Sequence, residues 1–578
     1  MTDTTNPWAG YPVPALRREA RHGDRVVACF ADRPASLHAM FTASVARQPL
    51  ADALVFEGQR QTYQQVDASS ERLGAGLSAL GIQAGDRVVM LIDNRPEFVI
   101  TLLALQRLRA IAVPVGVREQ APGLAYILRQ CGAMAIVLDA ALADRLPDAH
   151  DAPALQHRIS VGAAPGCVPL ASLASEHASP APPNAQTDAA SKRPTPAETP
   201  TESPTVGPNS GPDSDTAVIL YTSGTTGHPK GAMLTHANIV HSVLHYQACM
   251  KLGPTDRSAL AVPASHVTGL IAIIAAMLHV GGAIVIVPAF KAGSFIALLA
   301  AEQVTHTLMV PAMYNLCLLH PSFADAQLDK WRIGGYGGAP MPVTTIDALT
   351  QRLPGLTLLN AYGATETTSP ATMMPMGHTR AHADSVGVAL PAANIRVMDD
   401  AGRELPPGET GELWIAGPMV VPGYWADPEA TAASFTAGYW HSGDLGSVDA
   451  QGYVRLFDRQ KDMLNRGGYK VYSVEVEMVL MTWPGMVEAA IVGRPCPVLG
   501  ERVHAFVVAA ADDSMASAEA AGAADVAADE LQRSTALRAF CAARLADYKV
   551  PETITWCAQA LPRNANGKLM KRLLRGKR

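Results

Sequence analysis

The chain has 578 residues, of which 48% are hydrophobic and 17% charged, with a formal net charge of −6. This length exceeds one simple core, so we expect two or more domains, and the charge gives no reason to expect nucleic acid or an anionic membrane. The eight cysteines contain no Cys-x-x-Cys pair, which is typical of free thiols in a reducing cytosol. The amino terminus lacks a signal-peptide pattern, so we expect a cytoplasmic protein.

Short apolar runs alternate with amphipathic segments through the first 140 residues. Ser36 and Thr62 each stand just before a segment whose apolar residues recur at helical spacing. We expect each of them to cap a helix. Such alternation is typical of βαβ units and a mostly parallel sheet. The expected strands are 53–56, 87–92, 111–115 and 134–138, with a helix over 96–108.

Three later stretches need separate interpretation. Residues 178–215 hold nine prolines and almost no large apolar side chain, so we expect a disordered surface insertion. Residues 511–530, rich in Ala and Asp, form a second low-complexity insertion. The apolar run 269–290 is long enough for a membrane span. Because Gly281-Gly282 interrupts it, we expect a helix over 270–278, a turn and a strand over 283–287, and no membrane span.

Tyr221 to Gly231 reads Tyr-Thr-Ser-Gly-Thr-Thr-Gly-His-Pro-Lys-Gly and follows an apolar strand over 217–220. A short run over 232–234 and a helix capped by Thr235 come after it, so we expect the loop to lie between two strands. Glycines let backbone N–H groups surround an anion, while hydroxyls and Lys230 add donors and charge. The spacing predicts a polyphosphate site. A Walker A loop is excluded, because Pro229 stands where its second glycine would be.

This loop resembles the phosphate loop of the adenylate-forming (AMP-binding) superfamily, which includes acyl-CoA synthetases, luciferases and peptide-synthetase adenylation domains. Later motifs match the family in the same order, at 334–340, 360–367, 439–445, 458–462 and 561–568. Outside the two insertions the resemblance covers about residues 36–575. It implies an α/β fold. A large domain over 1–460 would have parallel sheets, flanking helices and a small β subdomain, and a small mobile α+β domain would occupy 461–578.

The resemblance implies a two-step reaction with ATP, Mg²⁺ and coenzyme A. A carboxylate attacks the α-phosphate of ATP to form an acyl-adenylate and pyrophosphate, and a thiol then displaces AMP. The first step gathers charge on phosphate oxygens and therefore needs cations and preorganised donors. The implied enzyme is an acid–CoA ligase for a monocarboxylic acid with an apolar tail. We expect a fatty acid, because fatty acids are the commonest substrates of this kind. The alternatives are an aryl-acid CoA ligase and an adenylating enzyme that loads a separate carrier protein.

Other readings carry less weight. A luciferase-like oxygenase is a poorer match, and a silent ATP- or AMP-binding module is disfavoured because Lys568, Glu366 and Asp444 are all present. The partners would be the acid, ATP and CoA. The oligomeric state stays open, a homodimer included.

The resemblance also implies roles for individual residues. Lys568, Glu366 and Thr365 would be catalytic, with Glu366 and Thr226 near the metal. The ATP- or AMP-binding residues would be Thr222, Ser223, Gly224, Thr225, Thr226, Lys230, Gly338, Ala339, Pro340, Tyr362, Asp444 and Arg459.

The acyl pocket would include His266, Gly337 and Thr367, although His266 could equally be a core histidine. Lys461 would be the hinge between the domains, and Gly467, Gly468 and Tyr469 would face CoA. Taken singly, several of these motifs could be ordinary turns, and Lys461-Asp462 a solvated pair.

The basic end of the chain, including Lys571 and Lys577, is interpreted as a solvated helix end. Tyr472-Ser473 departs from the usual Ser/Pro context of the family before Glu475.

Overall fold

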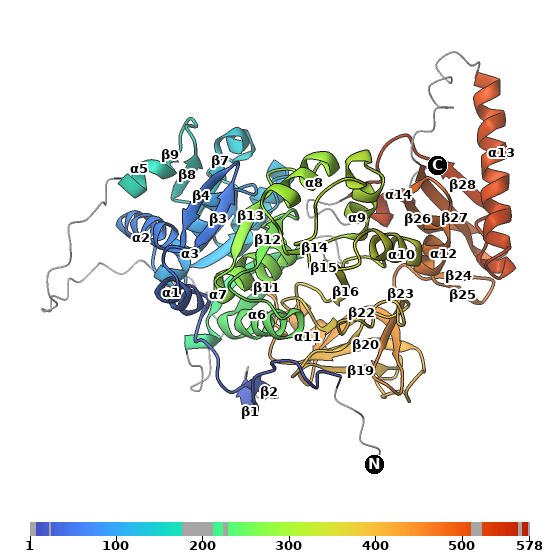
Figure 1. Ribbon diagram of the computed structural model, residues 1–578, viewed down its shortest axis with the longest axis horizontal. Helices are drawn as coiled ribbons and strands as arrows, with labels where there is room; N and C mark the ends of the chain where they lie inside the picture. Colours follow the sequence, from blue (N-terminus) through green and yellow to red (C-terminus); the bar gives the residue numbers. More distant parts are fainter. Residues whose placement is uncertain are drawn as a thin grey trace, which may run out of the picture.

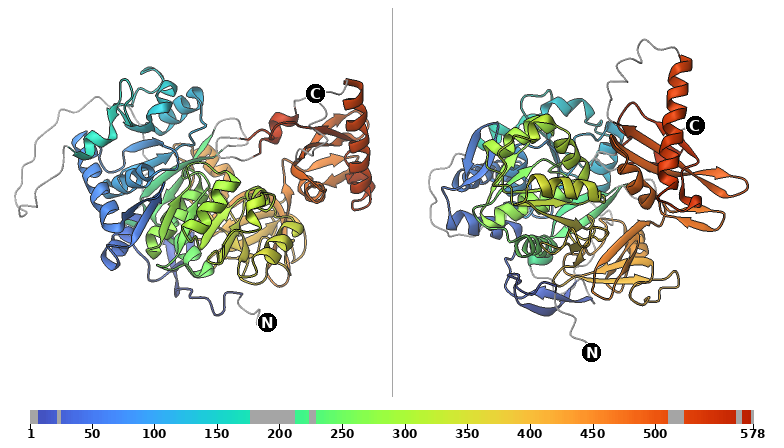
Figure 2. Two further views of the ribbon diagram at one scale, coloured as in Figure 1. Left: turned by 45° about the horizontal axis from the view of Figure 1, so that its top comes forward. Right: turned by 45° about the vertical axis from the view of Figure 1, so that its right-hand side comes forward.

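The fold is taken from a computed structural model that describes residues 7–21, 25–175, 212–222, 229–509, 523–563 and 569–575. A large amino-terminal domain carries a smaller carboxy-terminal domain at one end of the molecule, with the long helix α13 (Ala523–Ala542) on the outer side of the small domain (Figures 1 and 2). The predicted α/β class with two unequal domains is confirmed.

The first large sheet is parallel except for its edge strand β11, which runs antiparallel to β10. This hairpin confirms that the glycine-rich loop connects two strands. The strand order is β11 (Lys230–Thr235), β10 (Thr216–Thr222), β6 (Ile111–Pro114), β5 (Arg87–Leu91), β7 (Ala135–Asp139), β8 (His157–Val161) and β9 (Val168–Pro169).

The second large sheet is parallel in its centre and antiparallel at both ends. Its order is β18 (Val388–Ala389), β17 (Thr372–Met373), β16 (Thr357–Tyr362), β15 (Ile333–Tyr336), β14 (His306–Met309), β12 (Arg257–Leu260), β13 (Ala283–Ile286), β3 (Asp52–Phe56) and β4 (Gln59–Thr62).

Helices fill the space between and around these sheets, and the largest apolar cluster joins residues of both sheets to α1, α2, α3 and α6. Ser36 caps α1, and Thr62 and Thr235 form capping boxes at α2 and α6, as predicted. The helices of the large domain are α1 (Leu37–Arg47), α2 (Tyr63–Ala79), α3 (Pro96–Leu108), α4 (Ala121–Cys131), α5 (Leu170–Ser175), α6 (His236–Met250), α7 (Ala276–Val280), α8 (Ala292–Ala301), α9 (Pro311–Leu318), α10 (Val343–Arg352) and α11 (Pro428–Ser434).

The remaining sheets are smaller. The hairpin β1 (Leu16–Arg21) and β2 (Arg25–Phe30) precedes α1, and an antiparallel subdomain contains β19 (Asn394–Met398), β20 (Gly411–Ala416), β21 (Phe435–Thr436), β22 (Tyr439–Val448) and β23 (Val454–Arg459). The small domain combines α12 (Ser473–Met481), α13 and α14 (Lys571–Arg575) with β24 (Leu464–Arg466), β25 (Tyr469–Val471), β26 (Met486–Cys496), β27 (Gly500–Ala509) and β28 (Thr553–Trp556).

The predicted disorder of residues 178–215 is wrong at the carboxyl-terminal end of that stretch. Residues 212–214 form a 3₁₀ turn, and Asp213 pairs with Arg21 and Arg33 at 2.8 and 3.0 Å, so this end of the first insertion is anchored by charge. Within the second low-complexity stretch α13 begins at residue 523. Alanine has the highest intrinsic helix propensity, which accounts for a helix in this alanine-rich stretch. Residues 176–211 and 510–522 lie outside the described residues.

The apolar run 269–290 folds inside the large domain. A π-helical segment, η3 (Thr268–Ala275), continues into α7, and Gly281, with φ +84°, ends the helix before β13. The predicted helix–glycine–strand order is therefore confirmed, with a π-helical first part. Within the described ranges no helix is both long and apolar enough to cross a membrane.

Candidate active site

The described edges of the glycine-rich loop face each other across the β10–β11 hairpin. Thr222 ends β10 and is paired in register with Lys230, the first residue of β11. Residues 223–228 and 564–568 lie outside the described residues. The roles predicted for Ser223, Gly224, Thr225, Thr226 and Lys568 therefore stay predictions.

Glu366 is the buried acidic group beside this hairpin, with 8% of its surface exposed. Its Oε1 accepts a hydrogen bond from the Tyr424 hydroxyl at 3.0 Å, and Thr222 Oγ1 lies 3.5 Å away. Within the described residues both of these hydrogen bonds are at Oε1, so Oε2 is not used by either. A carboxylate oxygen of this kind suits a hard cation such as Mg²⁺, so the residues present fit the implied metal.

Tyr424 is a site residue that the sequence analysis missed. The backbone around it runs alongside β11, with Trp425 N donating to Gly231 O at 2.7 Å and Met233 N donating to Gly423 O at 3.1 Å. The ring lies under Lys230, whose Nζ is 5.1 Å from its centroid. Burial, followed by the charge of Glu366, raises the pKa of Tyr424. Tyr424 therefore stays protonated and links Glu366 to the base of the predicted phosphate site. The Gly-Tyr-Trp run at 423–425 was the available signal.

The turn that follows Glu366 has an unusual backbone. Thr368 and Ser369 have φ of 49° and 36°, and both residues are buried. Left-handed φ is costly for residues with side chains and persists where surrounding packing enforces it, often at functional sites.

The second acidic group is Asp444, which lies on β22 opposite β23. Asp444 and Arg459 are register partners on these strands, and Arg459 Nε lies 3.1 Å from Asp444 Oδ1. The Tyr362 hydroxyl donates to Asp444 Oδ2 at 2.7 Å. Each carboxylate oxygen retains acceptor capacity, so Asp444 can still bind a pair of hydroxyl groups.

The two acidic groups lie within electrostatic range of each other. Burial lowers the pKa of Arg459, but the nearby carboxylates of Asp444 and Glu366 outweigh that effect and raise it. Arg459 therefore keeps its charge beside Asp444. The structure thus brings together Thr222, Lys230, Tyr362, Glu366, Asp444 and Arg459, which the sequence motifs had singled out separately.

Glu412, on β20, bonds to the backbone next to Asp444. The sequence analysis missed this residue as well. Its Oε1 accepts from Gly443 N and its Oε2 from Trp414 Nε1, both at 2.9 Å. Gly443 lies within β22 and has φ +66°, a conformation that favours glycine. The carboxylate of Glu412 therefore fixes the strand backbone next to Asp444.

The segment predicted to lie beside adenine follows β15. Gly338, Ala339 and Pro340 are exposed at its end, and Gly338 has φ +76°. A Cβ on Gly337 would lie 2.4 Å from Ala361 O, so only glycine allows β15 to approach β16 this closely. The close approach holds this segment next to Tyr362, the last residue of β16.

Three further predicted residues are described by their local surroundings, and their roles stay predictions. His266 is half-buried, with Nδ1 3.2 Å from Thr268 Oγ1. Thr367 is buried, and its hydroxyl bonds within its own turn to Ala364. Thr365 is half-buried one residue before Glu366.

The residues predicted to face CoA lie on the surface of the small domain. Gly467 and Gly468 form the β24–β25 turn, and Tyr469 is 61% exposed and stacks on Tyr548 at 4.7 Å between ring centroids. Lys461 is exposed between β23 and β24, and its carbonyl accepts from Arg575 at 3.0 Å. The hinge and CoA roles therefore stay predictions.

The interpretation of Lys571 as a solvated tail lysine is wrong. Its side chain is 12% exposed, and its Nζ lies 2.6 Å from Glu477 Oε1. Arg575 likewise pairs with Asp462 at 2.9 Å. The chain end folds back as α14 because acidic partners on the small domain neutralise it. Lys577 lies outside the described residues.

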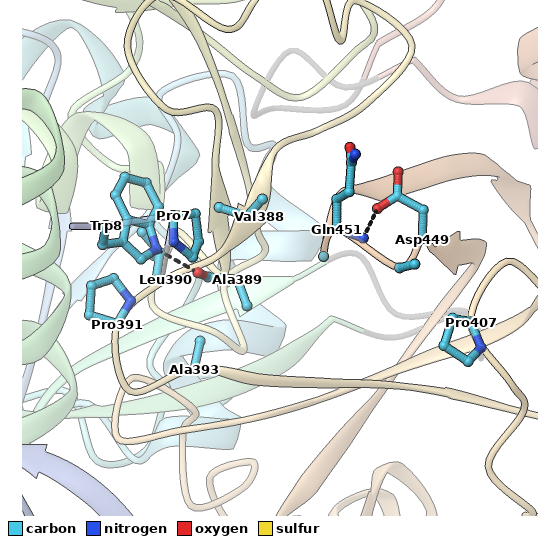
Figure 3. A pocket seen from close by; sticks show the side chains of 12 residues that line it. Pro7, Trp8, Val388, Ala389, Leu390, Pro391, Ala393, Pro407, Asp449 and Gln451 are labelled. Carbon is cyan, nitrogen blue, oxygen red and sulfur yellow. Dashed lines mark hydrogen bonds between the residues drawn. The ribbon is translucent and has the colours of Figure 1, made fainter. Parts of the chain in front are cut away.

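A hollow of about 420 Å³ lies elsewhere on the large domain (Figure 3). The Trp8 indole stands at its wall and donates to Ala389 O at 2.8 Å. None of the predicted site residues line it, so the polar clusters define the candidate site. Its lining is Pro7, Trp8, Val388, Ala389, Leu390, Pro391, Ala393, Pro407, Asp449, Ala450, Gln451 and Gly452.

Comparison with known proteins agrees with this geometry. A feruloyl-CoA synthase of Amycolatopsis sp is 32% identical over 523 residues, covering 90% of this chain and 95% of that protein. The long-chain-fatty-acid–CoA ligase FadD13 of Mycobacterium tuberculosis is 31% identical, covering 89% and 93%. The crystal structure of ATP-bound MatB from Rhodopseudomonas palustris superposes with a TM-score of 0.76 at 28% identity, covering 94% of this chain and 98% of that one.

Two family models match the chain. The model of the AMP-binding enzyme C-terminal domain matches residues 475–568, a range that begins inside α12 and includes β26, β27 and β28. The model of the AMP-binding enzyme matches residues 41–425, which include the glycine-rich loop, Glu366 and Tyr424. The chain belongs to the AMP-binding enzyme family.

Proposed function

We propose that this protein is an ATP-dependent acid–CoA ligase that forms an acyl-adenylate from an apolar monocarboxylic acid and then transfers the acyl group to CoA. The observation that carries the proposal is a pair of acidic clusters, one in the turn after β16 and the other on β22. Glu366 with Tyr424 and Thr222 lies beside the phosphate loop, and Asp444 with Tyr362 and Arg459 offers a diol-binding carboxylate.

In this mechanism Lys230 and the hydroxyl-rich loop hold the β- and γ-phosphates of ATP. Asp444 binds the ribose hydroxyls and Tyr362 lies against adenine, so that the α-phosphate is directed at Thr365 and Glu366. Magnesium, when bound at Glu366, neutralises charge on the phosphate oxygens. Lys568 bridges the acid carboxylate and the α-phosphate, which stabilises the charge that builds up as pyrophosphate leaves.

The second half-reaction needs the small domain to turn. We place the domain boundary between Gln460 and Lys461, with the large domain over 1–460 and the small domain over 461–578. Rotation about Lys461 carries Lys568 away and brings Gly467, Gly468 and Tyr469 toward the acyl-adenylate. Gly467, Gly468 and Tyr469 are exposed in this structure, which fits the domain orientation used for adenylation.

An aryl-acid CoA ligase is the second candidate, and packing beside Gly335 favours it. A Cβ on Gly335 would lie 3.2 Å from Leu308 Cγ and 3.3 Å from Met250 Cε, so α6 and β14 press closely against β15 there. The Tyr246 hydroxyl lies 2.9 Å from Ser369 Oγ, and both residues are buried. We take this close packing as support for a compact acid.

The test is acid-dependent AMP production with and without CoA, over short, medium and long fatty acids and aryl acids. Turnover that needs CoA and rises with one class of acid would support the ligase and identify that class. A single burst of adenylate, with turnover only when a carrier protein is added, would favour carrier loading. One relative, the fatty acid–[acyl-carrier-protein] ligase ScoC of Streptomyces coeruleorubidus, is 30% identical over 541 residues. No AMP with any acid would contradict the proposal.

A further inference from the structure

A buried chain of polar contacts connects the large domain to α12 and α14, the first and last helices of the small domain. Its members are Asp458 near the end of β23, Ser473 at the start of α12, Glu477 one turn later, and Lys571 at the start of α14. Asp458 and Ser473 are 5% and 0% exposed. The predicted hinge, Lys461, lies in the sequence between Asp458 and the other three residues.

Asp458 caps the first helix of the small domain. Ser473 N donates to Asp458 Oδ2, and Ser473 Oγ donates to Asp458 Oδ1 at 3.0 Å. Tyr472, at the N-cap position, makes no side-chain capping bond. A carboxylate from the large domain therefore takes the place of an N-cap residue, where the helix dipole favours negative charge.

Lys571 extends this contact to the chain end. Its Nζ donates to Ser473 Oγ at 2.6 Å and lies 2.6 Å from Glu477 Oε1. The Ser473 hydroxyl thus accepts from Lys571 and donates to Asp458, joining three segments through one oxygen. The side chains of Lys571 and Glu477 are 12% and 17% exposed. Charges buried to this extent hold their positions because separating them would leave one unpaired.

In the sequence, one end of the network adjoins the nucleotide site and the other end closely follows the predicted catalytic lysine. Asp458 precedes Arg459, which pairs with Asp444. At the other end Lys571 follows Lys568 by three residues, and an antiparallel bridge joins Arg563 to Leu569 on either side of that lysine. A displacement of α14 would therefore move the chain that carries Lys568.

We propose that Lys571 is a positioning residue for adenylation, and that the Asp458–Ser473 contact is a latch that holds the small domain in the adenylating orientation. Because the two latch residues lie on opposite sides of Lys461, rotation about that hinge separates them. The latch must therefore open before thioester formation. This inference rests on the proposed acid–CoA ligase function.

The decisive variant is Ser473→Ala, which removes the shared hydroxyl and leaves every charge in place. Adenylation is measured by acid-dependent exchange of pyrophosphate into ATP, and thioester formation by adding CoA with chemically prepared acyl-adenylate. We expect exchange to fall about 10-fold, the effect of one hydrogen bond to a charged group, while thioester formation is unchanged or faster. Equal loss in both half-reactions, or no loss in either, would overturn the proposal.

Lys571 is tested with a conservative pair, because Lys571→Ala could unfold the domain by leaving Glu477 unpaired. Lys571→Arg keeps the charge and should retain most of the exchange activity, whereas Lys571→Met combined with Glu477→Gln should lose it while thermal unfolding shows a folded protein. Arg572→Ala is the matched control, since Arg572 is the exposed neighbour on α14. Equal exchange in the Arg variant and the Met/Gln variant would contradict a positioning role.

A readout independent of activity separates the latch from the proposed function. Trypsin can cut after Arg459 and Lys461, between the two latch residues. Cleavage there should be faster in Ser473→Ala than in wild type and unchanged in Arg572→Ala. Unchanged cleavage in Ser473→Ala would overturn the latch, even in an active enzyme. Failure of the wild type with every acid would instead overturn the proposed function.

Discussion

The Tyr424 hydroxyl donates a hydrogen bond to Glu366 at 3.0 Å, across 58 positions of sequence, while the Tyr424 ring lies under Lys230. One side chain therefore holds the proposed metal-binding carboxylate and supports the base of the phosphate loop. Neither contact touches the reacting atoms, so Tyr424 acts by positioning Glu366.

Tyr424→Phe should weaken adenylation while the ring still packs. Loss of one hydrogen bond to a charged group predicts a fall of about 10-fold in kcat/KM for ATP, together with a higher magnesium concentration for half-maximal rate. Tyr453→Phe is the control, because it removes another hydroxyl contact, 2.6 Å to His378. Equal magnesium dependence in both variants would contradict the role of Tyr424.

Asp444→Asn tests the ribose site. The variant keeps the shape of the side chain but loses the charge that faces Arg459 at 3.1 Å. We expect KM for ATP to rise about 10- to 100-fold, since bonds to a charged acceptor contribute about 1.5–3 kcal/mol. The control is Asp449→Asn, which removes the charge that pairs with Arg455 at 2.8 Å. Asp449 lies in the connection between the same two strands. An ATP KM that changes equally in both variants would argue against a ribose contact.

The sequence predicted what depends on local pattern. Ser36, Thr62 and Thr235 cap their helices as expected, because capping needs only residues a few positions apart. The ordered motifs likewise identified Glu366, Asp444 and Arg459. Tyr424 and Glu412 were not found and Lys571 was misinterpreted, since their partners are set by tertiary packing. Glu412 reaches Gly443 across two strands, and Lys571 reaches Glu477 only because α14 folds back onto the small domain.

Lys568→Ala should abolish most of the adenylation. Removing a preorganised cation from the developing charge predicts a loss of about 100-fold or more in acid-dependent pyrophosphate exchange. Thioester formation from prepared acyl-adenylate should be much less affected, because Lys568 has moved away by then. A near-normal exchange rate would remove this assignment.

Lys461→Pro tests the hinge. Proline fixes φ and so limits the backbone change that rotation needs. Adenylation should persist while thioester formation is lost, as measured by acyl-CoA released per adenylate formed. Lys461→Ala is the control, since it removes the charge but leaves the backbone free. Similar loss in both half-reactions of the proline variant would contradict a hinge.

Buried neutral histidines should make stability fall in mild acid. Burial lowers the pKa of His279 and His306 to about 4 and that of His245 to about 3. Each value lies below the ordinary pKa of about 6.5, so the unfolded chain binds more protons between those values. The free energy of unfolding therefore falls as pH drops from about 6.5 toward 4, by up to about 1.4 kcal/mol per pH unit for each such histidine.

Urea unfolding at about pH 7.5 and about pH 5.5 measures this dependence, because the first value lies above the window and the second within it. His279→Gln replaces a titrating ring, which lies 3.0 Å from Gln247, with a neutral amide and should reduce the loss of stability between the two pH values. His150→Gln is the matched control, because it makes the same substitution at a side chain that is 95% exposed. Identical pH dependence in wild type and His279→Gln would show that His279 is protonated in the folded protein and that its burial carries no cost in acid.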